Sequence, residues 1–219
     1  MTSRPAHVLL ADPAWKFGDA LPGKGRGASK HYATMPVNEI QRFPLPPIAD
    51  DCWLFLWRVS AMPQEALDVA KAWGFRVVSE VVWVKAPEIG AHKEPAKGTV
   101  LYRSFKEMDK KLLAVGLNHT FRGAPHVITA EEARRVTIGM GHSVRMAHEV
   151  CLIAKRGRPT RNSPLNVPSV FFAPRGEHSA KPDAFYDLVE RFAPGPYVEL
   201  FARRQRPGWT CLGDEAGGP

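Results

Sequence analysis

The chain has 219 residues and a formal net charge of +8, and its hydrophobic fraction of 44% is that of a globular protein rather than a disordered one. No apolar run approaches the roughly 18–20 residues of a membrane span, and no signal peptide is recognisable at the N-terminus. The three cysteines, Cys52, Cys151 and Cys211, form no CxxC pair, which argues against a disulfide scaffold and indicates reduced core thiols. We therefore expect a cytoplasmic protein that does not contact the membrane.

Short apolar runs alternate with helical patterns along most of the chain. The runs that predict strands span residues 7–11, 52–57, 76–85, 149–155, 168–173, 197–202 and 209–213. Spacing and capping signals predict helices at residues 36–43, 60–73 and 181–193, the second with Ser60 as its N-cap and Gly74 at its end. This alternation indicates an α/β fold, with a mostly parallel sheet covered by helices on both faces.

One stretch, residues 86–138, has no strong strand signal and interrupts the alternation. We interpret it as a partly helical insertion in a single domain that spans residues 1–219. Its Lys106, Lys110 and Lys111 are predicted to share one side of a helix. The hypothesis is that these lysines help to grip a nucleic acid, and a structural flap or a self-association surface is the alternative.

The excess of basic residues, 30 Lys and Arg against 22 Asp and Glu, favours polyanionic partners and nucleic acid first. Basic side chains gather in three loop-like segments, at residues 16–31, 155–161 and 203–206, which together suit a groove along a phosphate backbone. The histidines show no metal-ligand spacing, so no metal site is expected. The candidates for nucleic-acid contact are Lys16, Lys24, Arg26, Tyr32, His142 and Arg145.

The segment Asp12-Pro13-Ala14-Trp15 follows the first predicted strand, and the active sites of open α/β sheets lie at the carboxyl ends of strands. Its chemistry suits methylation of an exocyclic amine, whose lone pair is delocalised into the ring. Asp12 and the Pro13 carbonyl can each accept one N–H of the amine and stabilise the nitrogen as it becomes positive. Trp15 can stack on the base. A solvated Asp-Pro turn beside a core tryptophan is the alternative interpretation.

Eight segments with ordered spacing carry a family resemblance. They are DPAW (12–15), HYATMPVNEI (31–40), DDCWLFLW (50–57), WGFRVVSEVVWVK (73–85), GMGHSVRMAHEVCLIAKRG (139–157), SAKPDAFYDLVERFAPGP (179–196), ELFARR (199–204) and GWTCLGDE (208–215). Together they resemble the MT-A70-like family of S-adenosylmethionine-dependent N6-adenine methyltransferases. The resemblance covers residues 7–85 and 139–215.

The resemblance implies a Rossmann-like methyltransferase fold in which the catalytic motif precedes the cofactor motifs. It implies Asp12, Pro13, Ala14 and Trp15 as the catalytic segment and S-adenosylmethionine as the cofactor, without a metal. The residues implied to bind the cofactor are Asp12, Lys181, Glu199, Leu200, Phe201, Arg203, Asp214 and Glu215. Lys181 corresponds to a lysine that meets the donor's carboxylate, and a surface lysine before a helix is the alternative. Ala14 stands where the family usually has proline, for which we expect a looser turn.

The implied partner is nucleic acid. We expect DNA rather than RNA because the sequence contains no zinc-finger pattern and no Arg-Gly tract. RNA N6-adenosine methylation, a catalytically silent nucleic-acid-binding subunit and N4-cytosine methylation are the alternatives. The sequence leaves open whether the protein is a monomer or a homodimer.

Overall fold

A computed structural model describes residues 4–16, 34–85, 146–162, 167–176 and 180–213. The predicted insertion at 86–138 lies outside these residues. Seven strands form one sheet, and all seven were predicted from the apolar runs. They are β1 (Ala6–Ala11), β2 (Ile48–Arg58), β3 (Arg76–Lys85), β4 (His148–Arg156), β5 (Val170–Ala173), β6 (Tyr197–Leu200) and β7 (Trp209–Leu212).

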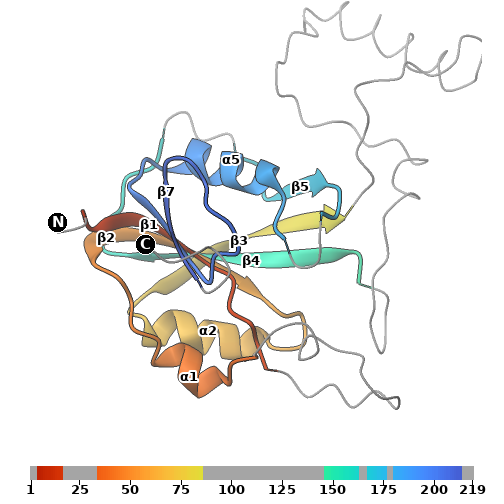
Figure 1. Ribbon diagram of the computed structural model, residues 1–219, viewed down its shortest axis with the longest axis horizontal. Helices are drawn as coiled ribbons and strands as arrows, with labels where there is room; N and C mark the ends of the chain where they lie inside the picture. The colour runs from red at the N-terminus through yellow and green to blue at the C-terminus, as the bar shows by residue number, and fades with distance from the viewer. Residues whose placement is uncertain (1–3, 17–33, 86–145, 163–166, 177–179, 214–219) are drawn as a thin grey trace, which may run out of the picture.

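The strand order is β5-β3-β4-β2-β1-β6-β7 (Figure 1). Four neighbouring pairs are parallel, whereas β4 runs antiparallel to both β2 and β3. The sheet is therefore mostly parallel, as expected, with one reversed strand near its centre. Because β4 is reversed, its first residues lie at the same edge of the sheet as the last residues of β2 and β3.

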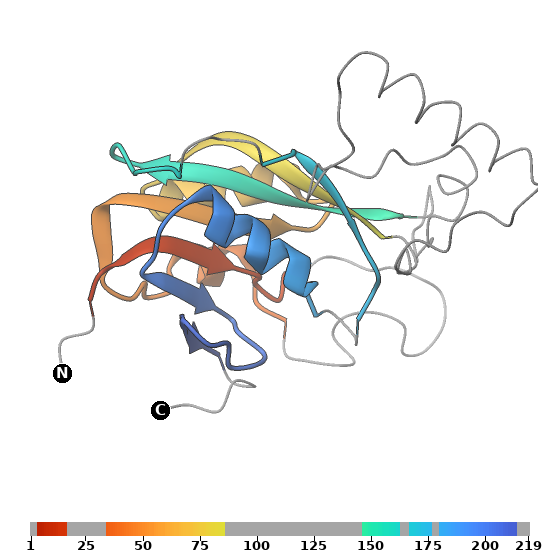
Figure 2. The same ribbon diagram turned by 90° about the horizontal axis from the view of Figure 1, so that it is seen from above.

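Helices cover both faces of the sheet, so the Rossmann-like α/β prediction is confirmed. Helices α1 (Val37–Gln41) and α2 (Pro63–Ala72) lie on one face, and α5 (Asp183–Phe192) lies on the other (Figure 1). Seen from above, α5 runs along the sheet in the same general direction as the strands (Figure 2). The architecture is thus three layers, with the sheet in the middle.

Side-chain alternation along the central strands builds two hydrophobic cores. In β2, Trp53, Phe55 and Trp57 face α5, whereas Leu54 and Leu56 face α2. Each core strand is apolar on both faces because it is buried on both. The cysteines lie in these cores as free thiols, and burial raises the pKa of Cys52 to about 12. No helix in the described part of the chain is long and apolar enough to span a membrane.

Helix α2 begins later than predicted. Its N-cap is Met62, no side chain caps it, and Pro63 occupies the first turn, so the prediction of Ser60 as the cap was wrong. Proline fixes the backbone angle that a first helical turn requires and gives up an N–H that would be unpaired there. The end was predicted correctly, because Gly74 follows the helix with φ of +82°, a conformation that glycine adopts without strain.

Candidate active site

The site lies at the sheet edge where β1, β2, β3 and β6 end and β4 begins. Asp12 follows β1, Lys85 ends β3 and Glu149 is the second residue of β4. Lys181 comes from the segment that leads into α5. Four charged side chains from four segments of the chain therefore meet at one edge, which is the usual position of a ligand site in an open α/β sheet.

Lys181 is the centre of a chain of ion pairs. Its Nζ lies 2.6 Å from Asp12 Oδ2 and 3.3 Å from Glu149 Oε2. The other oxygen of the same carboxylate, Glu149 Oε1, lies 2.7 Å from Lys85 Nζ. The Lys181 side chain is only 8% exposed, so it is not the surface lysine of the alternative interpretation.

Burial and the ion pairs have opposite effects on the pKa values of Asp12, Glu149 and Lys181. Burial raises the pKa of the Asp12 carboxyl, and Lys181 counteracts only part of that effect. Burial also disfavours the Lys181 ammonium, but Asp12 and Glu149 outweigh it and raise the pKa of Lys181. For Glu149, burial is outweighed by Lys181 and Lys85, which hold the pKa of the carboxyl below its usual value. Asp12 is thus a carboxylate whose charge depends on one buried ammonium group.

The ammonium groups of Lys85 and Lys181 each lie over the face of a tryptophan ring. Lys181 Nζ lies 5.0 Å from the centroid of the Trp57 ring, and Lys85 Nζ lies 5.4 Å from that of Trp83. Such contacts favour the charged form of lysine. The Trp57 indole N–H is buried and has no acceptor within the described part of the chain. Because an unpaired buried donor is costly, it is a feature typical of sites that receive a ligand or a water molecule.

The turn after Asp12 is closed by backbone hydrogen bonds. Trp15 N donates to the Pro13 carbonyl at 2.9 Å, Met35 N donates to Ala14 O at 2.7 Å, and Lys16 N donates to Met35 O at 3.0 Å. None of these bonds involves the Ala14 side chain, and the looser turn expected from alanine at this position stays a prediction. The Pro13 carbonyl uses one lone pair in the turn, and its second remains able to accept a hydrogen bond.

Trp15 does not lie where a stacking platform must lie. It is 4% exposed, and its indole Nε1 donates to the Trp57 carbonyl at 3.0 Å. It packs in the core on the α2 side of the sheet. The prediction that Trp15 stacks on the base is therefore not supported by its position; this ring fixes the turn that carries Asp12, as in the alternative interpretation of a core tryptophan.

The end of β6 has an unusual backbone. Phe201 adopts φ of +61°, which is uncommon for a residue with a side chain and is often found at functional sites. Its ring contacts Phe43, with centroids 4.6 Å apart. A Cβ on Gly213 would lie 2.6 Å from Ala202 N, so only glycine allows this close approach of the two segments. Phe201 is half-buried, and its role as an apolar wall of the donor site stays a prediction.

Glu199 is more enclosed than the prediction of a pocket-lining residue implies. Its side chain is 6% exposed, and the Tyr186 hydroxyl donates to Oε1 at 2.9 Å. Burial raises the pKa of Glu199 to about 7, even though the hydrogen bond from Tyr186 lowers it. Its neighbour Leu200 is fully buried in the core facing α2. Both residues therefore support the strand end rather than face an open site.

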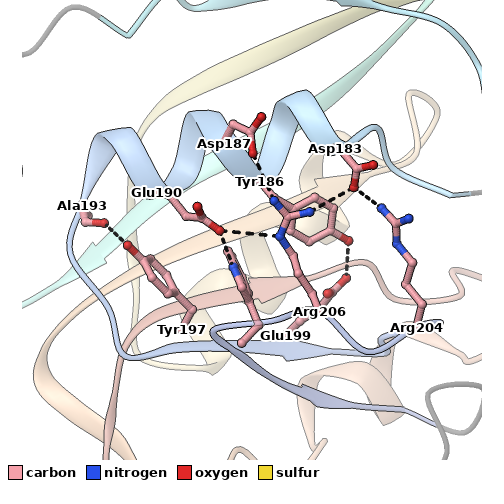
Figure 3. Close-up of polar contacts among 10 residues, drawn as sticks. Asp183, Tyr186, Asp187, Glu190, Ala193, Tyr197, Glu199, Arg204 and Arg206 are labelled. Atoms are coloured by element: carbon pink, nitrogen blue, oxygen red, sulfur yellow. Dashed lines mark hydrogen bonds and ion pairs between the residues drawn. The ribbon is translucent and has the colours of Figure 1, made fainter.

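The third basic segment pairs with acids instead of forming a phosphate groove. Figure 3 shows Arg204 and Arg206 reaching across to α5, where both contact Asp183. Arg206 also lies 3.1 Å from Asp187, and its guanidinium covers the Tyr186 ring at 4.5 Å. The prediction of a basic groove was wrong for these two arginines, because the α5 carboxylates neutralise them.

The remaining site predictions divide into two groups. Lys16 is exposed next to the turn after Asp12, and the charge of Arg203 opposes the rise in the pKa of Asp12, which places both near the site. The other predicted residues lie outside the described part of the chain: Lys24, Arg26, Tyr32, His142, Arg145, Asp214 and Glu215. Among the described residues, no three His, Cys, Asp or Glu side chains are placed to hold a metal ion.

Glu149 and Lys85 were missed by sequence analysis. Each was read as the end of a predicted strand, EVCLIAK and RVVSEVVWVK, and not as a site residue. The available signal was a charged residue bordering an apolar run, VCLIA for Glu149 and VVWV for Lys85, the same signal that singles out Asp12 after HVLLA. Only the reversed direction of β4 brings these ends together.

Comparison with known proteins finds relatives among the methyltransferases. The chain is 26% identical over 215 residues to the N(6)-adenosine-methyltransferase catalytic subunit METTL3 of Homo sapiens, and likewise to the N(6)-adenosine-methyltransferase MT-A70-like protein of Drosophila melanogaster. It is 25% identical over 229 residues to the type II methyltransferase M.MunI of Mycoplasma sp.

The matches cover different shares of these relatives. They span 96% of this chain but only 28% of the human protein and 27% of the fly protein, so the chain corresponds to about a quarter of each. The match to M.MunI spans 95% of this chain and 77% of that protein. The model of the MT-A70 family matches residues 6–124 and 125–215. The chain therefore belongs to the MT-A70 family.

Proposed function

We propose that this protein transfers a methyl group from S-adenosylmethionine to the N6 amine of adenine in a nucleic acid. The observation that carries the proposal is the Asp12–Lys181 pair at the carboxyl end of β1, 2.6 Å apart and largely buried. A carboxylate held in this way is a fixed acceptor at the carboxyl end of a strand, which is the usual position of the active site in an open α/β sheet.

Asp12 acts by accepting an N–H of the amine. It favours the transition state because the nitrogen becomes more tetrahedral and positive as its bond to the methyl carbon forms and the carbon–sulfur bond breaks. The Pro13 carbonyl, with one lone pair free, can accept the second N–H. Lys181 keeps Asp12 ionised before the reaction, which the buried carboxyl would otherwise resist. The proton leaves after the nitrogen has become cationic, so no strong base is required.

The residues at this edge fit the donor. When bound, S-adenosylmethionine supplies an electrophilic methyl group on a sulfonium ion. The Lys181 ammonium and the guanidinium of Arg203 are the cations near Asp12 that would hold its carboxylate. Phe201 would form the apolar wall for its adenine. The Trp57 ring, over which Lys181 lies, also carries a buried N–H without an acceptor among the described residues.

We propose DNA as the substrate, because the match to the type II methyltransferase M.MunI spans 77% of that protein, whereas the match to human METTL3 spans 28% of it. RNA is the second candidate, favoured by the names of the METTL3 relatives, which are N(6)-adenosine methyltransferases. The experiment supplies tritiated donor with matched DNA and RNA oligonucleotides, and mass spectrometry identifies the methylated nucleoside.

The matched variants are Asp12→Asn and Asp68→Asn, the second an exposed carboxylate on α2. Asp12→Asn removes the negative charge that stabilises the cationic nitrogen, and loss of one such electrostatic contact costs about 10²–10³ in rate, so this variant should lose nearly all transfer while Asp68→Asn retains it. Transfer by Asp12→Asn at the wild-type rate would refute the catalytic assignment. Methylated adenosine from RNA alone would replace DNA with RNA.

A further inference from the structure

A pocket of about 450 Å³ opens on the α5 face of the sheet, away from Asp12. Trp53, on its wall, pairs with Val8, which lies four residues before Asp12 along β1. At roughly 3.3 Å per residue, the two positions are about 13 Å apart along the strand. The pocket also includes Lys155 near the end of β4, the end opposite to Glu149. It is therefore separate from the candidate active site.

One part of the pocket is apolar and rigid. Its wall includes Trp53, Val81, Ile153, Leu188 and Phe192, from three strands and α5, and all five are buried in the core that faces α5. A volume of this size is within the range of small-molecule sites, which are mostly apolar with a few convergent polar groups.

The other part of the pocket is basic. Lys155, Arg158 and Arg161 line it, whereas Glu80 is the acidic residue among its described lining residues. The side chains of these three cations form no ion pair with any carboxylate of the described residues. This arrangement contrasts with that of Arg204 and Arg206, whose charges α5 neutralises.

The segment that carries the two arginines is anchored to the fold. Trp53 Nε1 donates to Thr160 O at 2.8 Å, and Asn162 N donates to Phe192 O at 2.9 Å. Asp51 accepts a hydrogen bond from the backbone N–H of Arg158 at 2.6 Å, which leaves the Arg158 guanidinium unused. The backbone of residues 158–162, which carries Arg158 and Arg161 and is called the rim of the pocket below, is thus fixed before any ligand binds. A fixed backbone lowers the entropic cost of binding.

From this combination we propose that the pocket binds a nucleoside phosphate. The phosphate would contact Lys155, Arg158 and Arg161, and the base would lie against the apolar wall beside Trp53. An inorganic anion would leave the wall unused, and a neutral apolar ligand would leave three cations unpaired. The inference goes beyond the proposed function, because it does not require this chain to transfer a methyl group. The nucleoside phosphate can be a free nucleotide or one unit of a nucleic acid strand.

The test measures binding of dTMP by calorimetry, without a methyl donor. Thymine has no exocyclic amine, so dTMP is not an acceptor for the proposed reaction. The variant Arg158→Gln/Arg161→Gln removes two charges from the rim, and the matched control Arg42→Gln/Lys71→Gln removes two exposed charges on the side of α1 and α2. We expect the rim variant to bind dTMP at least about tenfold more weakly, and the control to bind as wild type does. Thymidine and inorganic phosphate should each bind more weakly than dTMP.

A second arm identifies the source of the ligand. Anisotropy of a labelled dT12 oligonucleotide is measured for the same proteins, with dTMP as competitor. Displacement by dTMP, with a salt slope about 1.4 smaller in the rim variant, indicates a strand site, because each single-strand phosphate contact contributes about 0.7. Binding of dTMP that does not displace dT12 indicates a free-nucleotide site.

The proposal is overturned if dTMP fails to bind the wild-type protein at millimolar concentration. It is also overturned if the folded rim variant binds dTMP as tightly as the control variant does. Because no arm measures methyl transfer, failure here leaves the proposed function untouched. Conversely, a protein without transferase activity could still bind dTMP in this pocket.

Discussion

Replacing Lys181 with methionine should reveal how strongly Asp12 depends on it. Methionine keeps much of the buried stem in place over Trp57 but leaves the Asp12 carboxylate without its partner. Breaking a buried pair from one side typically costs about 3–5 kcal/mol. The cost here has a ceiling, because Asp12 can protonate instead. Protonating a carboxyl of ordinary pKa at pH 7 costs about 4 kcal/mol, so we expect Lys181→Met to lose about 3–4 kcal/mol of stability.

Replacing the other partner of the pair, Asp12, should cost less stability. In Asp12→Asn, Lys181 keeps Glu149 at 3.3 Å, so its charge remains compensated. In the double variant Asp12→Asn/Lys181→Met neither charge is left, and Glu149 retains Lys85 at 2.7 Å. We therefore expect the double variant to be more stable than the sum of the single effects predicts, with a coupling of about 2 kcal/mol.

The assay is urea unfolding followed by tryptophan fluorescence, at pH 5 and at pH 7. In Lys181→Met the folded state holds Asp12 protonated, whereas Asp12 is ionised in the unfolded state at neutral pH. The variant therefore loses stability relative to wild type as the pH rises. The deficit of Lys181→Met should therefore be larger at pH 7 than at pH 5. Lys71→Met, an exposed lysine on α2, is the control. Additive effects of the two single substitutions, within about 0.5 kcal/mol, would refute the coupled buried pair.

Further predictions concern the donor, the catalytic turn and β6. Lys181→Ala should weaken S-adenosylmethionine binding at least about tenfold in calorimetry, and unchanged affinity would remove Lys181 from the donor site. Trp15→Phe should lose about 1–3 kcal/mol in urea unfolding, since the Trp57 carbonyl loses its donor at 3.0 Å; an unchanged midpoint would contradict the buried position. Gly213→Ala should destabilise by about 1–3 kcal/mol, because its Cβ would crowd Ala202; wild-type stability would disprove that close approach. The pKa of Glu199 is about 7 in the folded state and ordinarily 4.5, so ionisation of this residue destabilises the folded wild-type protein as the pH rises. Between pH 5 and 8, the stability of Glu199→Gln should therefore rise by up to about 3 kcal/mol relative to that of wild type. Parallel pH profiles of stability for the two proteins would contradict this prediction.

The central strands β2 and β4 could be predicted because each contains a continuous apolar run that is buried on both faces. The same property conceals direction: EVCLIAK has the same pattern read either way, so the reversal of β4 was not predictable. Direction decides which end of a strand reaches the active edge. Asp12 could be found because it follows an apolar strand and precedes Pro13, whereas Glu149 required knowledge of the topology.

The surroundings of individual side chains were the second feature that could not be predicted from the sequence. A tryptophan beside a candidate catalytic carboxylate suits either stacking on a base or packing in a core, and the two are distinguished by the burial of Trp15 and its bond to the Trp57 carbonyl. The arginines after β6 also formed a basic segment by composition. Their neutralisation depends on Asp183 and Asp187, about twenty residues earlier in the chain, and this proximity arises from the packing of α5.

The reversal of β4 also affects how the family can vary. Val84 pairs with His148, and Lys85 N donates to Ala147 O at 2.8 Å, so the chain leaves the sheet and returns to it at adjacent points. The connection between them is topologically a hairpin loop, whose closure entropy rises only slowly with its length. Segments of very different length and sequence can therefore be exchanged at this place during evolution without altering the sheet. Both ends border the Lys85–Glu149 pair, so each such exchange would begin and end beside the candidate active site.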